Sequence, residues 1–199
     1  MDESVQAALR KWPNVPAAYG WLSLDRRGGW LLEGRPLRHA RTIAFINRNY
    51  LADAHSAWLF QNGPQRVYVA LAYTPWVLHR HPDRPPGAAG ALVTHTGGAV
   101  ERLDGAWVDE EGNLLLETPR GIGLLDDRDL VAYGAAFCDE HGRPPNDAAL
   151  EAGLAALMDG EAAALGLRDG DRILPVQSIR CAEVPARFGF IQHPAPGAE

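Results

Sequence analysis

Cysteines and long hydrophobic runs are scarce in this 199-residue sequence. Only Cys138 and Cys181 occur, and their wide spacing excludes a disulfide framework or a paired-cysteine metal motif. No stretch approaches the roughly 20 apolar residues that a membrane-spanning helix needs. The first residues, MDESVQAALRKW, lack the apolar core of a signal peptide. We therefore expect a soluble protein of the reducing cytoplasm, with no membrane partner.

Positive charge and catalytic motifs are also scarce. The 19 basic residues, of which only Lys11 is a lysine, are outnumbered by 25 acidic ones. The net charge of −6 opposes binding to a polyanion, so no nucleic-acid partner is predicted. The motifs G-x-S-x-G, G-x-x-x-x-G-K, H-E-x-x-H, G-x-G-x-x-G and C-x-x-C do not occur. The sequence therefore predicts no catalytic residue and no cofactor.

The apolar content is sufficient for a folded core. Hydrophobic residues make up 46% of the chain, enough for one ordinary core or two small ones. Local patterns predict an α+β fold rich in antiparallel hairpins, with a short helix near 41–50 and a longer helix near 147–166. We expect a hairpin-helix-hairpin subdomain over 1–80, a Pro/Gly-rich linker or loop over 81–90, and an α+β subdomain over 91–199. One continuous domain is the alternative.

Shorter elements follow from local signals. Residues 1–11 have helical spacing, and the Asp-x-x-Gly tetrad DRRG predicts a hairpin over Trp21–Leu32. Residues 128–137 and 186–192 are expected to be strands. The pattern D-x-x-G-x-Φ-L-L-E occurs at 25–33 and again at 109–117. For so short a match, shared turn chemistry is favoured over a duplicated half-domain.

The segment WLFQNGPQRVYVALAYTPWV, residues 58–77, has the strongest hairpin pattern. A four-residue loop over 62–65 would pair Gln61 with Arg66 and Phe60 with Val67. A three-residue loop would mix polar and apolar side chains on each face, so the first register is favoured. One face then carries Trp58, Phe60, Val67, Val69, Leu71 and Tyr73, and the other carries Gln61, Arg66, Tyr68 and two alanines.

The polar face of this hairpin is the candidate binding site. A planar guanidinium beside a tyrosine ring, with amide side chains at the strand ends, suits bidentate recognition of a carboxylate or phosphate. Three residues at the end of the preceding helix would join the site if that helix end meets the hairpin. The alternatives are a solvated sheet face and an ordinary helix cap. The predicted ligand-binding residues are Arg66, Tyr68, Asn62, Gln65, Asn47, Arg48 and Asn49.

Two pairs of metal-binding residue types are candidates for a metal site. His79 and His81 would share one side of a strand, and Cys138 and His141 are three residues apart. Neither pair has further ligands at a recognisable spacing, so no metal site is predicted.

The segments WPNVPAAYGWLSLD, FINRNY and FQNGPQRVYVALAYTPWV resemble an uncharacterised family of bacterial, mostly proteobacterial, proteins. The resemblance is strongest over residues 12–78. It implies a bacterial domain of unknown function and supplies no activity or catalytic residues.

Two functions from different classes remain open. The leading hypothesis is a non-enzymatic binding or interaction module for a small anionic ligand or a protein partner. A homo-oligomer is compatible with this hypothesis. Six tryptophans and neighbouring arginines suit such a surface. The alternative is a hydrolase-type enzyme that uses His and carboxylate residues, with or without a metal.

Overall fold

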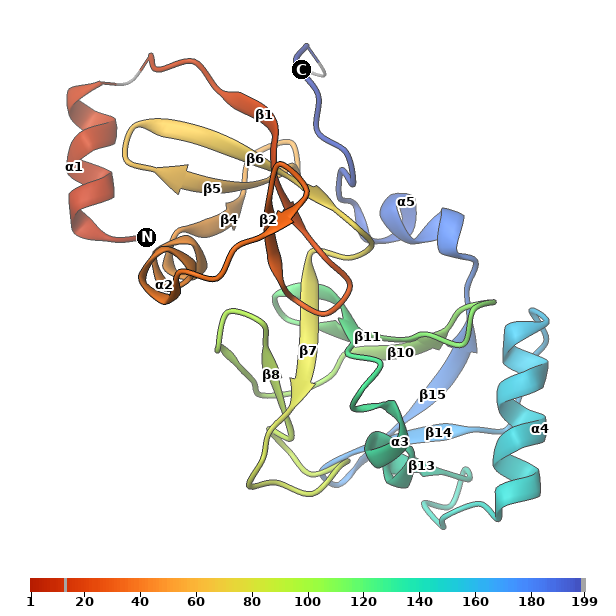
Figure 1. Cartoon of the computed structure of the whole chain (residues 1–199). Coiled ribbons are helices and arrows are strands. Elements are labelled where there is room, and N and C mark those ends of the chain that lie inside the picture. Colours follow the sequence, from red (N-terminus) through yellow and green to blue (C-terminus); the bar gives the residue numbers. More distant parts are fainter. Residues whose placement is uncertain (13, 198–199) are drawn as a thin grey trace. The chain divides into compact units, whose positions relative to one another are not determined.

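The computed structural model describes residues 1–12 and 14–197. The chain forms two compact units, residues 1–75 with the described part of 189–199, and residues 76–188 (Figure 1). Both units combine sheet and helix, which confirms the α+β class. Among the described residues, no helix is both long and apolar enough to cross a membrane.

The first unit is built on one sheet. Its strands in the order β3-β2-β1-β6-β5-β4 are antiparallel neighbours except for the central pair β1 and β6, which is parallel. The predicted helices at 1–11 and 41–50 and the hairpin over 21–32 are confirmed. The elements are α1 (Glu3–Lys11), β1 (Ala18–Leu24), β2 (Trp30–Leu32), β3 (Arg35–Pro36), α2 (Ala40–Arg48), β4 (Tyr50–Ala52), β5 (Trp58–Asn62) and β6 (Gln65–Leu71).

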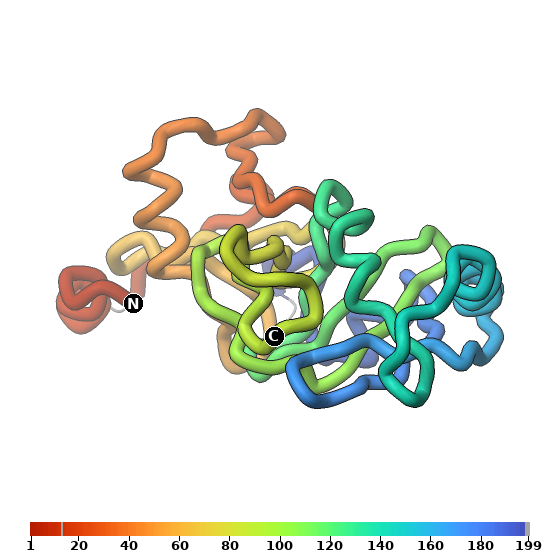
Figure 2. Tube along the Cα trace, turned by 90° about the horizontal axis from the view of Figure 1, so that it is seen from below, coloured from red at the N-terminus to blue at the C-terminus, as the bar shows by residue number. Residues whose placement is uncertain are grey.

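The β5–β6 hairpin has the predicted register. Gln61 pairs with Arg66 and Phe60 with Val67, but the ladder continues to Asn62 and Gln65, so the loop shortens to Gly63 and Pro64. A positive φ of 57° at Gly63 followed by proline is the pattern of a type II′ turn. The turn lies beside α1, where a Cβ added at Gly63 would be 3.9 Å from the Ala8 Cβ (Figures 1 and 2).

The second unit contains the other sheet, in the order β13-β14-β15-β10-β11-β12-β7-β8-β9. The pairs β10–β15 and β7–β12 are parallel, and the remaining pairs are antiparallel. Its strands are β7 (Trp76–Arg80), β8 (Leu92–Thr94), β9 (Ala99–Val100), β10 (Gly105–Val108), β11 (Leu114–Thr118), β12 (Gly121–Leu125), β13 (Phe137–Cys138), β14 (Gly166–Asp169) and β15 (Arg172–Ser178). Its helices are α3 (Leu130–Tyr133), η1 (Gly134–Ala136), α4 (Asp147–Met158), η2 (Cys181–Glu183) and α5 (Val184–Phe188).

The boundary between the two units does not lie in the Pro/Gly-rich segment. Residues 81–90 form the loop between β7 and β8, inside the second unit. The division falls at Pro75–Trp76, and the chain returns to the first unit at residue 189. The return is fixed by hydrogen bonds from the Ile191 N–H to the Ser56 carbonyl (3.1 Å) and from the Leu71 N–H to the Gln192 carbonyl (2.9 Å).

Two predicted strands are wrong. Residues 128–137 contain α3 and η1, in which Tyr133 and Ala136 are buried three residues apart, a helical spacing. Residues 186–192 contain the end of α5 rather than a strand; Pro185 is tolerated because it lies in the first turn of that helix.

The longer helix is shorter than predicted. α4 begins at Asp147 with Asn146 as N-cap, as expected, but ends at Met158. Gly160 has a φ of 88°, the left-handed conformation that terminates helices, and residues 166–169 form β14 instead.

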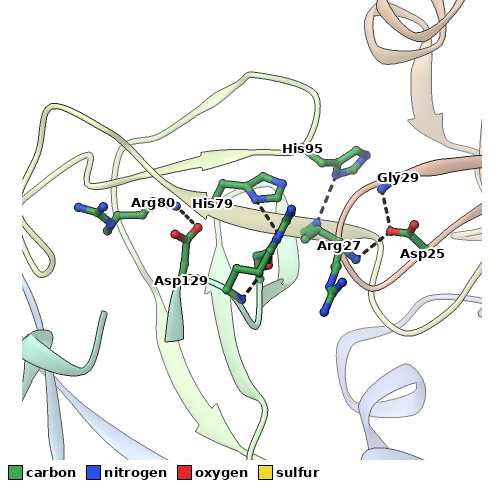
Figure 3. Close-up of polar contacts among 10 residues, drawn as sticks. Asp25, Arg27, Gly29, His79, Arg80, His95 and Asp129 are labelled. Atoms are coloured by element: carbon green, nitrogen blue, oxygen red, sulfur yellow. Dashed lines mark hydrogen bonds and ion pairs between the residues drawn. The ribbon is translucent and has the colours of Figure 1, made fainter. Parts of the chain in front are cut away.

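The two sheets share a six-strand arrangement. The order β12-β11-β10-β15-β14-β13, with a parallel pair at its centre, repeats the order of β3 to β4 in the first unit. The repeated nine-residue pattern falls on the equivalent hairpins β1–β2 and β10–β11. In each turn the Asp Oδ1 accepts the N–H groups of the second and fourth following residues, at 2.7–2.8 Å for Asp25 (Figure 3) and 2.9–3.0 Å for Asp109. The shared topology supports the duplication that the nine residues alone disfavoured.

Candidate functional site

A pocket of about 350 Å³ opens on the Tyr68 face of the β5–β6 hairpin. Its walls come from the N-terminal residue, α1, β1, β4, β5, β6, the turn after β4 and the returning C-terminal segment, all within the first unit. The apolar walls include Leu51, Leu59 and Ile191. The polar lining is Tyr19, Asp53, His55, Gln61, Arg66 and Tyr68.

A hairpin turn holds the Asp53 carboxylate at the edge of this pocket. Its Oδ1 accepts the N–H groups of His55 and Ala57, each at 2.9 Å, and its Oδ2 accepts the Tyr68 hydroxyl at 2.8 Å. Burial alone would raise the pKa of Asp53, but these hydrogen bonds outweigh burial and lower the pKa below its ordinary value. The carboxylate is therefore ionised and fixed in place at neutral pH.

Tyr68 donates to Asp53 and lines the pocket beside Arg66. The Tyr68 ring is buried and stacks parallel to Tyr19, with the ring centroids 4.5 Å apart. Burial, and then the hydrogen bond to Asp53, raise the pKa of Tyr68 to about 12, against the opposing effect of the Arg66 guanidinium. Tyr68 is thus a neutral hydroxyl that donates to Asp53. The exposed guanidinium of Arg66, which has five N–H donors, retains donors for a ligand.

The structure does not bring Asn62 and Gln65 to this pocket. Both side chains line a separate groove on the opposite face of the hairpin, because residues alternate between the two faces of a strand. The Gln65 Nε2 also lies 3.4 Å from the Pro16 carbonyl oxygen, to which it donates.

The three predicted residues at the end of α2 bind other parts of the first unit. The Asn47 Oδ1 accepts the Trp30 indole N–H at 2.8 Å, and Arg48 forms an exposed ion pair with Asp2 at 3.2 Å. The buried Asn49 accepts the backbone N–H of Asp2 at 2.8 Å. None of the three lines the pocket, and their contacts attach α2 to β2 and to the residue that precedes α1.

The sequence reasoning missed three polar residues of the pocket. Asp53 begins an Asp-x-x-Ser turn of the kind already recognised at Asp25, so its position had a local signal. His55 belongs to the same turn. Tyr19 reaches the pocket because β1 pairs with β6 in parallel, and no local pattern reports a pairing between segments so far apart.

The second unit contains a separate histidine-carboxylate pair. The His79 Nδ1 lies 3.2 Å from the Oδ2 of the buried Asp126, which Arg128 also contacts. Burial acts to raise the pKa of Asp126, but the hydrogen bonds from Arg128 outweigh burial and lower the pKa below its ordinary value. Nearby, burial and then the charge of His79 lower the pKa of His95 to about 3. The described residues include no group of three or more His, Cys, Asp or Glu arranged to hold a metal.

Comparisons with known proteins identify a family without an assigned activity. The DUF2944 family model, described as a protein of unknown function (DUF2946), matches residues 1–195, which confirms the resemblance to an uncharacterised family. No curated protein matches the chain.

Similarity to one solved structure supports the fold alone. A DUF1285 family protein from Silicibacter pomeroyi DSS-3 is similar over 90% of this chain and 97% of its own, with a TM-score of 0.54 and 13% identity. A second DUF1285 family protein, from Shewanella baltica OS155, covers 56% of this chain and 88% of its own, with a TM-score of 0.40 and 14% identity.

Proposed function

The chain belongs to the DUF2944 family of proteins of unknown function, and we propose that it is a non-enzymatic binding module whose Tyr68-face pocket takes a small anionic ligand. One observation carries the proposal. Arg66 is an exposed cation that lines the pocket together with Asp53 and Tyr68. A guanidinium in this position suits the bidentate binding of a carboxylate or phosphate.

The distribution of charge favours an anion at the first unit. Residues 1–75 and 189–199 contain 9 basic and 6 acidic residues, a net charge of +3. Residues 76–188 contain 10 basic and 19 acidic residues, a net charge of −9. The overall charge of −6 therefore conceals a positive first unit, whose field attracts anions to its surface.

The protonation behaviour of Asp53 and Tyr68 favours a structural role over acid-base catalysis for these two groups. A general acid or base works best when its pKa lies near the operating pH. The pKa of Asp53 is lowered and that of Tyr68 is raised to about 12, so neither group exchanges a proton readily near neutral pH. The pair instead forms a fixed polar wall of the pocket that Arg66 also lines.

The walls indicate what the rest of the ligand is. Leu51, Leu59 and Ile191 provide apolar surface beside the Tyr19 and Tyr68 rings. A volume of about 350 Å³ is at the lower end of the range for small-molecule sites. We expect a compact aromatic or aliphatic body with one carboxylate or phosphate group.

Thermal-shift titrations with small carboxylates and phosphates, each beside its neutral amide or alcohol analogue, test the proposal. A ligand at 100 times its Kd should stabilise the wild type by about 2.7 kcal/mol. Arg66→Gln should weaken binding by about tenfold or more, and Tyr68→Phe by less. Arg102→Gln, which removes an exposed charge in the second unit, is the control. The proposal fails if no anion stabilises the wild type, or if Arg66→Gln and Arg102→Gln have equal effects.

A hydrolase is the second candidate, on the evidence of the His79–Asp126 pair. A buried carboxylate 3.2 Å from an imidazole nitrogen can orient a general base. Turnover of ester or phosphoester substrates that is lost in His79→Gln but retained in Arg66→Gln would favour this candidate over the binding module.

A further inference from the structure

The apolar face of the β5–β6 hairpin forms one wall of a second, larger groove. The groove has a volume of about 620 Å³ and lies within the first unit. Trp21 and Leu32 are 57% and 47% exposed and both line this groove, so they form a contiguous exposed apolar surface. The apolar lining includes Trp21, Leu22, Leu32, Ile46, Phe60 and Val67.

The local structure explains how an exposed tryptophan comes to line the groove. The register between β1 and β6 shifts between Ala18 and Leu22, and Gly20 in this interval has a φ of 76°. A bulge of this kind redirects a side chain that regular alternation would place on the other face. Trp21 and its neighbour Leu22 consequently both reach the groove.

Three arginines next to groove residues form what we call the rim. Leu22 pairs with Leu32, and Leu32 pairs with Arg35, so these three side chains lie in one row on one face of the sheet. The exposed Arg38 and Arg41 are chain neighbours of the groove residues Leu37 and Thr42, and none of the three arginines is itself part of the lining. Positive charge therefore adjoins the apolar lining at β3 and at the start of α2.

This placement of charge does not serve the stability of α2. The first turn of α2 contains no acidic residue, although the positive end of a helix favours one, and Arg41 lies there instead. In the described part of the chain, Arg35, Arg38 and Arg41 have no ion pair. Local choices that oppose stability point to a role in binding.

We propose that the groove binds a free fatty carboxylate, with the acyl chain on the apolar lining and the carboxylate at the arginines of the rim. A volume of about 620 Å³ falls within the range of small-molecule sites. The apolar and charged surfaces are adjacent, as an amphipathic anion requires. This site is additional to the Tyr68-face pocket, because the two lie on opposite faces of the hairpin and share only Tyr19.

Calorimetric titration of the intact protein with octanoate, decanoate and dodecanoate, below their micelle concentrations, tests the proposal. Affinity should rise by about fourfold for each CH₂ group that enters the groove. Dodecyltrimethylammonium has the same alkyl chain length and the opposite charge. It should bind about tenfold more weakly or worse, because its cationic headgroup would lie beside like charges.

Variants test separately the contributions of the apolar lining and of the arginines to binding. Trp21→Ser should weaken dodecanoate binding by about tenfold, because it removes an exposed apolar wall without disturbing the core. Trp12→Ser, at another exposed tryptophan of the first unit, should leave binding unchanged. The triple variant R35Q/R38Q/R41Q should weaken binding of dodecanoate but not of dodecanol.

Several results would overturn the proposal. Equal affinity for the cationic and anionic probes would show that the arginines of the rim do not select for negative charge. Equal losses of dodecanoate affinity in Trp21→Ser and Trp12→Ser would show that the ligand does not bind in the groove. A dimer that Trp21→Ser dissociates, without dodecanoate binding in either form, would identify a second copy of the chain as the occupant. If Arg66→Gln abolishes dodecanoate binding and Trp21→Ser does not, the ligand occupies the Tyr68-face pocket instead.

Discussion

At the scale of single residues, the Tyr68 hydroxyl binds a carboxylate fixed by a turn, in a pocket that an exposed guanidinium also lines. Asp53 is positioned by two backbone N–H groups and Tyr68 by its stacking on Tyr19. The wall formed by Asp53 and Tyr68 is therefore ordered before a ligand binds, and a ligand need not supply the entropy of ordering these two side chains.

Tyr68→Phe tests this network through stability. Loss of the hydrogen bond to the Asp53 carboxylate should lower the free energy of unfolding by about 1.5–3 kcal/mol at neutral pH. Because the pKa of Asp53 is lowered in the folded state, its contribution is present above the unfolded pKa and is lost as pH falls through the folded value. The difference between the variant and the wild type should therefore narrow below about pH 4.

Urea denaturation at several pH values measures this difference. Tyr19→Phe is the matched control, since it keeps the stacked ring and should change stability by less than about 0.5 kcal/mol. A loss of stability as large in Tyr19→Phe, or one independent of pH in Tyr68→Phe, would contradict the network.

His95 gives a second prediction, on pH dependence. Burial keeps its folded-state pKa near 3, whereas the unfolded chain binds a proton near pH 6.5. Between these values the unfolded state holds more protons, so this histidine should reduce stability as pH falls, by up to about 1.4 kcal/mol per pH unit. In His95→Gln the free energy of unfolding should vary less between about pH 6.5 and about pH 4.5. Exposed His193→Gln is the control; equal slopes in wild type and His95→Gln would refute the prediction.

At the scale of elements, local chemistry decides where helices end. α4 stops two residues before Gly160, and Arg180 closes its C-terminal end by donating to the carbonyls of Met158 and Asp159 at 3.4 and 3.2 Å. Arginine in this position also complements the helix dipole. The end of α4 thus depends on the left-handed backbone at Gly160 and on the space that the Arg180 side chain occupies.

Gly160→Ala should lower the free energy of unfolding by about 1 kcal/mol or more, because the backbone has a φ of 88° and the new Cβ would lie 2.9 Å from the Arg180 Nη2. Gly134→Ala is the matched control. Gly134 has a φ of −50° and open space around its Cβ position, so alanine there should be neutral or stabilising by about 0.4–1 kcal/mol. Chemical denaturation of both variants measures the contrast, and equal effects would refute it.

The predictability of the elements follows from how local their causes are. The β5–β6 register could be predicted because a one-residue slip would exchange a polar and an apolar face. Residues 128–137 were mistaken for a strand, since a short helix with few buried positions has little periodicity to read. Of the predicted site, Arg66 and Tyr68 line one pocket, whereas Asn62 and Gln65 alternate to the other face.

At the scale of the whole molecule, the features that matter involve residues far apart in the sequence. The parallel pairing of β1 with β6 and the return of residue 191 to residue 57 place Tyr19 and Ile191 at the pocket. A net charge of −6 conceals the positive first unit. Neither feature can be read from a short window, although the charge division follows directly once the boundaries of the units are known.

The central claim is that the Tyr68-face pocket binds a small anion through Arg66. The most direct test is a ¹H–¹⁵N NMR titration with a carboxylate and its matched amide, such as benzoate and benzamide. Benzoate should cause saturable shifts of the amides around Tyr19, Asp53, Arg66 and Ile191, and these shifts should disappear in Arg66→Gln. Shifts that lie elsewhere, or that benzamide reproduces at the same concentration, would contradict the claim.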